Sequence, residues 1–428
     1  MAAISVLATG DSFITRRTAP TDALRKLGDV VRSAEARFTN FEVLTPCSEG
    51  FPNAVSGGTW ANAPAGVIDD LTAMGFNLVG WANNHTLDYS YGGLAATCRE
   101  LNRAGIVHAG VGRTLAEAAA PRYLECRSGR VALIACTATC HETDIAGQQR
   151  PDQAGRPGVN PLRHTDIYHL PRQELDTLAA LAAASGVNDS HTLRVKAGFE
   201  EPPEPGVVLF GKHRFREGTG AGMRSVPNAA DVARLHGAIA DARRQADFVL
   251  LSLHAHESRG VERTVPAAFV EEFCRGAIEA GAHAVLGHGP HVLRGIEIHQ
   301  GRPIFYSLGN FFFQNETVEN LPGDFYEKYH MGLTESTPDA LDKRSVNDTR
   351  GFIADPWAWK SVMARFVLED GTLASCELFA VELGGETRAR RGTPALSQDP
   401  SIFGHLVELC APYRTQLLLE GEVTRVKL

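Results

Sequence analysis

Short apolar runs alternate along the chain with longer stretches in which apolar residues recur every three or four positions. The first pattern is typical of buried strands and the second of amphipathic helices. The predicted strands are 3–9, 38–44, 76–82, 130–137, 246–254, 282–288 and 302–310, and the predicted helices are 21–38, 64–75, 92–105, 230–245 and 266–281. Because the strands are apolar throughout and are separated by helices, they predict an α/β protein with a largely parallel, buried sheet.

Two segments interrupt this alternation. Residues 141–225 are rich in Pro, Gly, His and Arg, and residues 314–360 are polar and aromatic. Connections this long are usually functional, so we expect two insertions, or lids, that cover a site and select its substrate. Surface decoration is the alternative. After them, the sequence predicts a hairpin turning at Asp370-Gly371 and a last helix over 401–418.

Composition narrows the class of protein. The chain has 428 residues, 43% of them hydrophobic and 21% charged, and we expect residues 1–428 to form one domain with insertions. A net charge of −8 argues against nucleic acid as the partner. Since no apolar run reaches the roughly 18 residues of a membrane span, and the first residues lack the basic segment of a signal peptide, we expect a cytoplasmic protein without a membrane partner. The eight cysteines are scattered and predict neither a disulfide framework nor a zinc ribbon.

Polar side chains recur where the predicted strands end. In chain order they are Asp11, Glu42, Asn84, His85, Asp88, His254, His256, Glu257, His288 and His291. Ligands of open α/β sheets bind beyond the carboxyl ends of the strands, so these side chains are expected to converge. Each motif alone is as typical of a turn or a cap. The combination of carboxylates, an amide and imidazoles predicts a divalent-metal site.

The motifs "TGDSF", "NFE", "WANNHTLDYS", "LHAHE", "GHGPHVLRGIE" and "PIFYSLGNFFF" give the chain a family resemblance. In this order they resemble the CapA (poly-γ-glutamate capsule biosynthesis) family, a branch of the calcineurin-like metallophosphoesterases. The resemblance covers residues 1–140 and 245–313. It implies a four-layer α/β/β/α sandwich with large insertions and a site at one edge, and therefore two mixed sheets in place of one parallel sheet.

The resemblance also implies roles for individual residues. His85 falls at the position of a general acid, and Asp88 is placed to orient it. The positions that match metal ligands are Asp11, Glu42, Asn84, His254, His288 and His291.

Two departures from the phosphoesterase pattern change the expected metal content. Phe13 stands where the Asp-x-His motif has its second ligand, and the bridging aspartate is either replaced by Asn40 or displaced to Glu42. A two-metal hydrolase needs both ions to hold the attacking and leaving oxygens. We therefore expect one divalent metal, with Ca²⁺ favoured over Mn²⁺ or Mg²⁺, and no organic cofactor.

A single hard cation beside acid–base groups suits proton transfer next to a carbonyl. The cation or a hydrogen-bond donor stabilises the negative charge that develops on oxygen. Two proton carriers on opposite sides of a Cα would invert it. His85 with Asp88 forms one candidate pair, and Asp11 with either His254 or His291 forms the other.

These departures, the two insertions and the expected lack of a membrane anchor make the chain similar to lasso-peptide (MS-271 type) C-terminal tryptophan epimerases. The similarity implies an isomerase whose partner is a ribosomal precursor peptide. Tyr329, Trp357 and Trp359 are the candidate substrate-binding residues, with ordinary packing as the alternative. Two other functions stay open. One is a phosphoesterase or an amide-bond enzyme acting on poly-γ-glutamate, and the other is a non-catalytic peptide- or polymer-binding protein. The oligomeric state is open.

Overall fold

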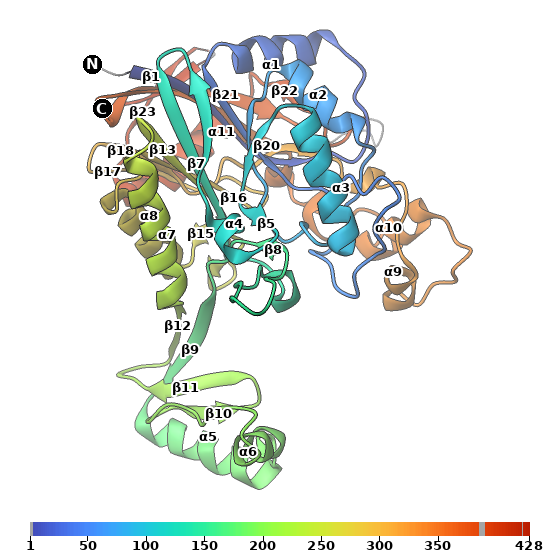
Figure 1. The fold of residues 1–428 in the computed structure, drawn as a ribbon, viewed down its shortest axis with the longest axis vertical. Coiled ribbons are helices and arrows are strands. Elements are labelled where there is room, and N and C mark those ends of the chain that lie inside the picture. Colours follow the sequence, from blue (N-terminus) through green and yellow to red (C-terminus); the bar gives the residue numbers. More distant parts are fainter. Residues whose placement is uncertain (1–2, 385–389, 422) are drawn as a thin grey trace.

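The computed structural model describes residues 3–384, 390–421 and 423–428 and is a mixed α/β fold with two large sheets (Figure 1). The first sheet has the order β23-β24-β21-β20-β1-β2-β3-β4, with β19 beside β1 and β22 beside β21. Its strands are β1 (Ala3–Phe13), β2 (Ala36–Phe41), β3 (Leu78–Gly80), β4 (Val107–Ala109), β19 (Asn310–Phe313), β20 (Lys360–Glu369), β21 (Thr372–Glu382), β22 (Ala395–Leu396), β23 (Leu417–Glu420) and β24 (Val423–Val426).

The second sheet has the order β17-β18-β16-β13-β7-β6. Its strands are β6 (Arg122–Cys126), β7 (Gly129–Thr137), β13 (Phe248–His254), β16 (Ala284–His288), β17 (Ile296–His299) and β18 (Arg302–Phe305). The longer helices are α1 (Asp22–Arg32), α2 (Gly66–Met74), α3 (Ser90–Arg103), α7 (Ala229–Arg243), α8 (Ala268–Glu279) and α11 (Pro400–Cys410). Short strand pairs, β5 (Val111–Gly112) with β8 (Gly158–Val159) and β14 (Ser258–Arg259) with β15 (Glu262–Pro266), and the short helix α4 (Leu115–Ala119) complete the body.

The prediction of one largely parallel sheet is wrong at the edges of both sheets. The central strands β1 to β4 run parallel, as do β7, β13, β16 and β18. The flanking strands β20, β21, β24, β6 and β17 are antiparallel. The pairs β6–β7, β17–β18 and β20–β21 are hairpins, which need only a tight turn and carry no crossover helix that would mark them as part of an alternating pattern.

The two sheets face each other across one hydrophobic core. Leu133 and Leu250 of the second sheet pack in the same buried cluster as Phe38 and Val79 of the first. The next residue of each strand in the second sheet points the other way, so that Ile134, for example, packs with residues of α7 and α8. This alternation explains why these strands are apolar throughout. Figure 1 shows α7 and α8 on one side of the molecule and α2 and α3 on the other.

Two predicted helices were drawn too long. The helix over 21–38 ends at Arg32, where the Ser33 hydroxyl donates to the Val30 carbonyl, and residues from Ala36 form β2. The helix over 401–418 ends at Cys410, shortly before Pro412, which has no N–H to donate, and Leu417 begins β23. A continuous apolar pattern hides both ends because strand and helix share it over a few residues.

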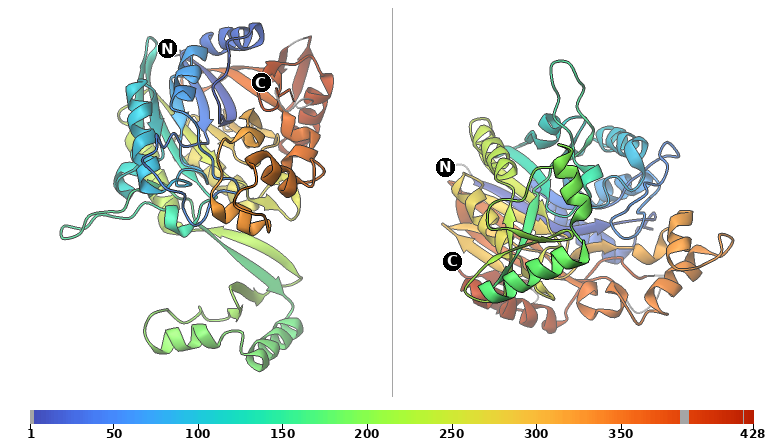
Figure 2. Two further views of the ribbon diagram at one scale, coloured as in Figure 1. Left: turned by 90° about the vertical axis from the view of Figure 1, so that its right-hand side faces the viewer. Right: turned by 90° about the horizontal axis from the view of Figure 1, so that it is seen from below.

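The two long segments fold differently from each other. Most of 141–225 forms an arm in which β9 (His164–Leu170) and β12 (Gly222–Pro227) lead to α5 (Arg172–Ser185), α6 (Asp189–Lys196), β10 (Val208–Phe210) and β11 (His213–Glu217). The arm stands out from the body (Figures 1 and 2). Residues 314–360 contain α9 (Gly323–Lys328) and α10 (Thr337–Ser345) and return to the body, since Arg344 donates to Thr59. The lid role of both segments stays a prediction. No helix among the described residues is long and apolar enough to cross a membrane.

Candidate metal centre and cavity

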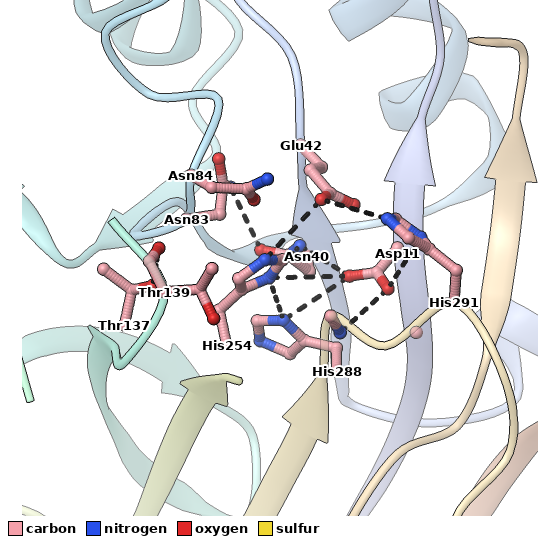
Figure 3. Close-up of polar contacts among 12 residues, drawn as sticks. Asp11, Asn40, Glu42, Asn83, Asn84, Thr137, Thr139, His254, His288 and His291 are labelled. Carbon is pink, nitrogen blue, oxygen red and sulfur yellow. Dashed lines mark hydrogen bonds and ion pairs between the residues drawn. The ribbon is translucent and has the colours of Figure 1, made fainter. Parts of the chain in front are cut away.

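The register of the parallel strands brings the polar side chains together. Asp11 lies opposite Asn40 across β1 and β2, and His254 lies opposite His288 across β13 and β16. All four are fully or almost fully buried. Because the carboxyl ends of both sheets meet at one edge of the sandwich, these pairs face one another (Figure 3). The predicted convergence of Asp11, Glu42, His254, His288 and His291 is what the structure has.

Asp11 lies among three imidazoles. Its carboxylate oxygens are 3.8 Å from His254 Nδ1, 3.5 Å from His288 Nδ1 and 3.6 Å from His291 Nδ1. It also accepts hydrogen bonds from Asn40 Nδ2 at 2.7 Å and from the Gly289 amide at 2.9 Å. Burial alone would raise the pKa of Asp11, but its interactions with His288 and the neighbouring histidines outweigh burial and lower it. Asp11 is therefore a carboxylate at neutral pH.

Glu42 is the opposite case. It is fully buried, and neither carboxylate oxygen accepts a hydrogen bond. Burial and the nearby charge of Asp11 raise the pKa of Glu42 well above its usual value. Its Oε1 atom is 3.6 Å from His254 Nε2 and 3.8 Å from His291 Nε2. A buried carboxylate without a donor is costly unless a cation or proton offsets it, so this residue fits a metal ligand.

Three overlapping groups place their ligand atoms within 4.8 Å of one another. They are Asp11 with His254 and His288, Glu42 with His254 and His256, and Asp11 with Glu42 and His291. These groups could therefore bind a buried divalent ion through carboxylate and imidazole ligands. His256 was not predicted as a ligand. Its spacing of two residues from His254 was the available signal, and His256 Nε2 lies 3.0 Å from His254 Nε2.

The predicted ligand role of Asn84 stays a prediction. Its Nδ2 donates to the Gly57 carbonyl at 3.0 Å, while its buried Oδ1 accepts no hydrogen bond. Asn83 instead donates to the Phe41 carbonyl and to Asn40 Oδ1. Only the second amide of the "NNH" motif therefore keeps an oxygen available.

His85 and Asp88 form a buried pair. His85 Nδ1 is 2.6 Å from Asp88 Oδ2, and Asp88 also accepts from the amides of Ala61 at 2.8 Å and Gly57 at 3.1 Å. A carboxylate in this position fixes the proton on Nδ1 and leaves Nε2 as the reactive atom. A Cβ on Gly57 would lie 2.8 Å from His85 Nε2, so this glycine leaves room beside that atom.

A cavity of about 320 Å³ opens beside these groups. His85, His256 and His291 line it on the side of the metal-ligand cluster. Its other lining residues are Phe13, Gly57, Gly58, Thr59, Phe313, Asn315, Glu316, Lys328, Tyr329, Arg344, Ser345, Arg350, Gly351, Phe352 and Ile353. The Phe13 ring meets the His85 ring edge-on with 5.1 Å between centroids. The residue at the position of the missing ligand therefore forms part of the cavity wall.

The three aromatic candidates for substrate binding lie in different places. Tyr329 lines the cavity. The Trp357 ring stacks on His405 with 3.9 Å between centroids, and the Trp359 indole donates to the Ile353 carbonyl at 3.2 Å. Neither tryptophan is among the described lining residues. Substrate contact by all three remains a prediction.

Arg294 was not predicted from the sequence. It is buried and holds residues 255–257, the segment that follows β13. Its guanidinium donates to the carbonyls of Ala255, His256, Glu257 and Arg263 at 2.9–3.2 Å. Burial lowers its pKa to about 10, which leaves it charged at neutral pH. These bonds fix the backbone that carries His254 and His256. Because the acceptors are backbone carbonyls, which every residue has, no sequence pattern predicts these hydrogen bonds.

Comparison with known proteins gives the relatives of this chain. Residues 5–315 match the family model described as "Bacterial capsule synthesis protein PGA_cap". The protein designated "Uncharacterized protein y4sH" of Sinorhizobium fredii is 33% identical over 446 residues, covering 99% of this chain and 93% of its own. "PGA biosynthesis protein CapA" of Bacillus subtilis is 32% identical over 152 residues, covering 32% of this chain and 37% of its own. A "Probable polyglutamine synthesis accessory protein" of Mycobacterium tuberculosis is 29% identical over 249 residues, covering 58% of this chain and 47% of its own.

Proposed function

The chain belongs to the bacterial capsule synthesis (PGA_cap, or CapA) family, and from this premise we propose that it is a metal-dependent peptide epimerase. Its reaction inverts the Cα of the C-terminal residue of a ribosomal precursor peptide, of the lasso-peptide kind. The observation that carries the proposal is that His85 and His291 line one cavity beside the carboxylate–histidine cluster. Each ring is fixed through Nδ1, by Asp88 and by the Asn310 amide oxygen at 2.8 Å, respectively.

The two histidines divide the proton transfers. Burial lowers the pKa of His291, so the ring is neutral and its Nε2 can accept a proton from Cα. The imidazolium that forms lies 3.6 Å from the Asp11 carboxylate, which stabilises its charge. His85 donates a proton to the other face of Cα from Nε2 while Asp88 holds its Nδ1–H. In the reverse direction the two rings exchange roles.

A divalent cation held by Asp11, Glu42, His254 and His288, with Asn84, would supply positive charge beside the substrate's carboxylate or carbonyl oxygen and leave His291 Nε2 free to accept the proton. We propose one such ion per chain. The oxygen ligands support Ca²⁺ as first choice, and the imidazoles support Mn²⁺ as the alternative. The face-to-face sheets, with α7 and α8 packed on the second, support a four-layer α/β/β/α description of the fold.

A hydrolase is the second candidate. Asp11, Glu42 and His254 each belong to two of the three ligand groups, so they could bridge two neighbouring ions. Two ions about 3.5–4 Å apart are the arrangement of metal-assisted phosphoester and peptide hydrolysis. Phosphoesters and γ-glutamyl amides are the substrate classes that this alternative predicts.

Incubation with peptides in D₂O separates these functions. The probes are acetylated hexapeptides ending in Trp, Phe or Tyr, with Ca²⁺ or Mn²⁺ present. Epimerisation adds one deuteron at the C-terminal Cα, inverts that residue and leaves the chain length unchanged. Cleavage of the peptide would favour the hydrolase, and binding without exchange or cleavage would favour a non-catalytic binding protein.

Variants assign the exchange to the site. His85→Gln and Asp88→Asn are expected to slow it by about 100-fold or more, the lower range for loss of one general acid–base group. Metal content should stay unchanged, because neither residue belongs to the carboxylate–histidine groups. Lys343→Gln, an exposed change on α10 away from the cavity, is the matched control. Unchanged exchange in His85→Gln would rule out the proposed proton carrier.

A further inference from the structure

Part of the cavity wall is cationic. Lys328 at the end of α9, Arg344 in α10 and Arg350 in the following loop line it. Glu316 is the one carboxylate among the described lining residues. Three positive charges against one negative charge attract an anion into the cavity.

Arg344 is fixed in position before any ligand arrives. Its Nη1 is 2.5 Å from Thr59 Oγ1, and its Nη2 is 3.0 Å from Glu316 Oε1. The side chain is only 18% exposed, and its guanidinium also lies 5.7 Å from the Phe325 ring. This arrangement costs little entropy when a ligand binds, but Glu316 offsets the charge of Arg344.

Lys328 and Arg350 carry the excess charge. Both are exposed, and neither forms an ion pair with any described residue. Lys328 lies over the Tyr329 ring, with 5.7 Å from Nζ to the centroid. Their charges are therefore free to pair with an anion that enters the cavity.

Four aromatic side chains also line the cavity. They are Phe13, Phe313, Phe352 and Tyr329. The Arg263 guanidinium covers the outer side of Phe352, with 4.8 Å from Cζ to the ring centroid. A ligand that fills this cavity therefore combines an apolar or aromatic group with an anionic one.

We infer that the cationic wall formed by Lys328, Arg344 and Arg350 binds a carboxylate of the peptide substrate and so selects peptides with an acidic group near the reacting residue. The inference rests on the proposed function in taking a peptide as substrate. The carboxylate comes from the C-terminus or from an Asp or Glu side chain nearby. Both sources present the same bidentate group to a guanidinium.

Three probes distinguish the sources by calorimetric binding to the full chain with Ca²⁺. They are N-acetyl-Gly-Trp as the free acid, N-acetyl-Gly-Trp amide, and N-acetyl-Glu-Trp amide. At least one carboxylate probe is expected to bind about tenfold more tightly than the Gly-Trp amide. Preference for the free acid identifies the C-terminus, and preference for the Glu probe identifies a side chain. Equal binding of all three probes would overturn the inference.

A double variant separates the wall from the metal, which also attracts carboxylates. Lys328→Gln with Arg350→Gln should reduce the carboxylate preference to about threefold or less, since each exposed pair contributes a few-fold. Lys343→Gln on α10 should leave it unchanged. A preference that persists in the double variant would assign the carboxylate to the metal and overturn the inference. Because binding is measured without turnover, loss of the carboxylate preference is distinguishable from failure of the deuterium exchange.

Discussion

At the scale of single residues, the two buried carboxylates Asp11 and Glu42 share one site but have different surroundings. Asp11 accepts two hydrogen bonds and lies among imidazoles, so its pKa is lowered. Glu42 accepts none, and burial followed by the charge of Asp11 raises its pKa. Asp11 is thus an anion at neutral pH, whereas Glu42 needs a bound cation to stabilise its carboxylate. This difference is the electrostatic basis for placing a metal beside Glu42.

Gly57 provides a test of the space beside His85. An added Cβ would lie 2.5 Å from Asn84 Nδ2 and 2.8 Å from His85 Nε2, so Gly57→Ala must displace one of these side chains. We expect at least about a tenfold loss of deuterium exchange, because a displacement near 1 Å misplaces a proton carrier. Gly220→Ala, on the arm in open space, is the control. Full exchange by Gly57→Ala would show that His85 Nε2 does not act from this position.

His283 gives a pH dependence of stability away from the site. The ring is buried, accepts from the Val249 amide at 2.8 Å and faces Arg243 and Arg302. Burial and these two positive charges lower its pKa from 6.5 to about 3. Between these values the unfolded chain binds a proton that the folded chain does not, so stability falls as the pH falls below 6.5.

The lowered pKa of His283 is expected to reduce the free energy of unfolding by about 2 kcal/mol at about pH 5. Urea unfolding of the wild type and of His283→Gln, at about pH 7.5 and about pH 5, measures it. The stability advantage of the wild type should shrink by that amount at the lower pH. An advantage that is the same at both values would contradict the lowered pKa.

At the scale of elements, the close approach of β1 to the turn before β19 fixes the position of Asp11. A Cβ on Gly10 would lie 1.7 Å from the Gly309 carbonyl oxygen, and the same oxygen accepts from the Asp11 amide at 3.0 Å. The strand therefore tolerates no side chain immediately before Asp11.

Gly10→Ala is accordingly expected to destabilise the fold by about 2 kcal/mol or more and to weaken metal binding. Gly404 in α11 has no atom within 4 Å of an added Cβ, so Gly404→Ala should instead stabilise by up to about 1 kcal/mol. Denaturant unfolding and metal titration of both variants check these values. Equal unfolding free energies and equal metal affinities of the two variants would show that Gly10 is not required for close packing against Gly309.

Strand ends were predictable from the sequence, and contacts between distant segments were not. Asp11, His254 and His288 follow apolar runs, so their convergence follows from strand polarity. The Arg294 bonds, the Gly57 contact and the fixing of Arg344 by Thr59 join segments far apart in the chain. Helix 21–38 was overextended because β2 continues its apolar pattern.

At the scale of the whole molecule, removing the arm of residues 164–227 tests whether the site requires it. Tyr168 and Met223 are paired across β9 and β12, and Arg224 beyond them forms an ion pair with Glu272 of α8 at 3.1 Å. Replacing residues 169–222 by Asn-Gly closes the ribbon with a favourable turn. Because no described residue of the removed part lines the cavity, metal content should be unchanged.

The same deletion tests the lid hypothesis for residues 141–225. That hypothesis predicts a raised KM for the peptide at unchanged metal content and unchanged thermal stability of the body. Loss of metal on deletion would show that the arm supports the centre. An unchanged KM would leave the arm without a part in substrate selection.

The proposed reaction requires a single metal ion bound where the two sheets meet. Anomalous diffraction from crystals soaked in Mn²⁺, with metal analysis of the protein, measures this directly. We predict one metal per chain, in contact with Asp11, Glu42 and at least one of His254 and His288. Absence of metal there, or two tightly bound ions per chain, would contradict the single-metal epimerase.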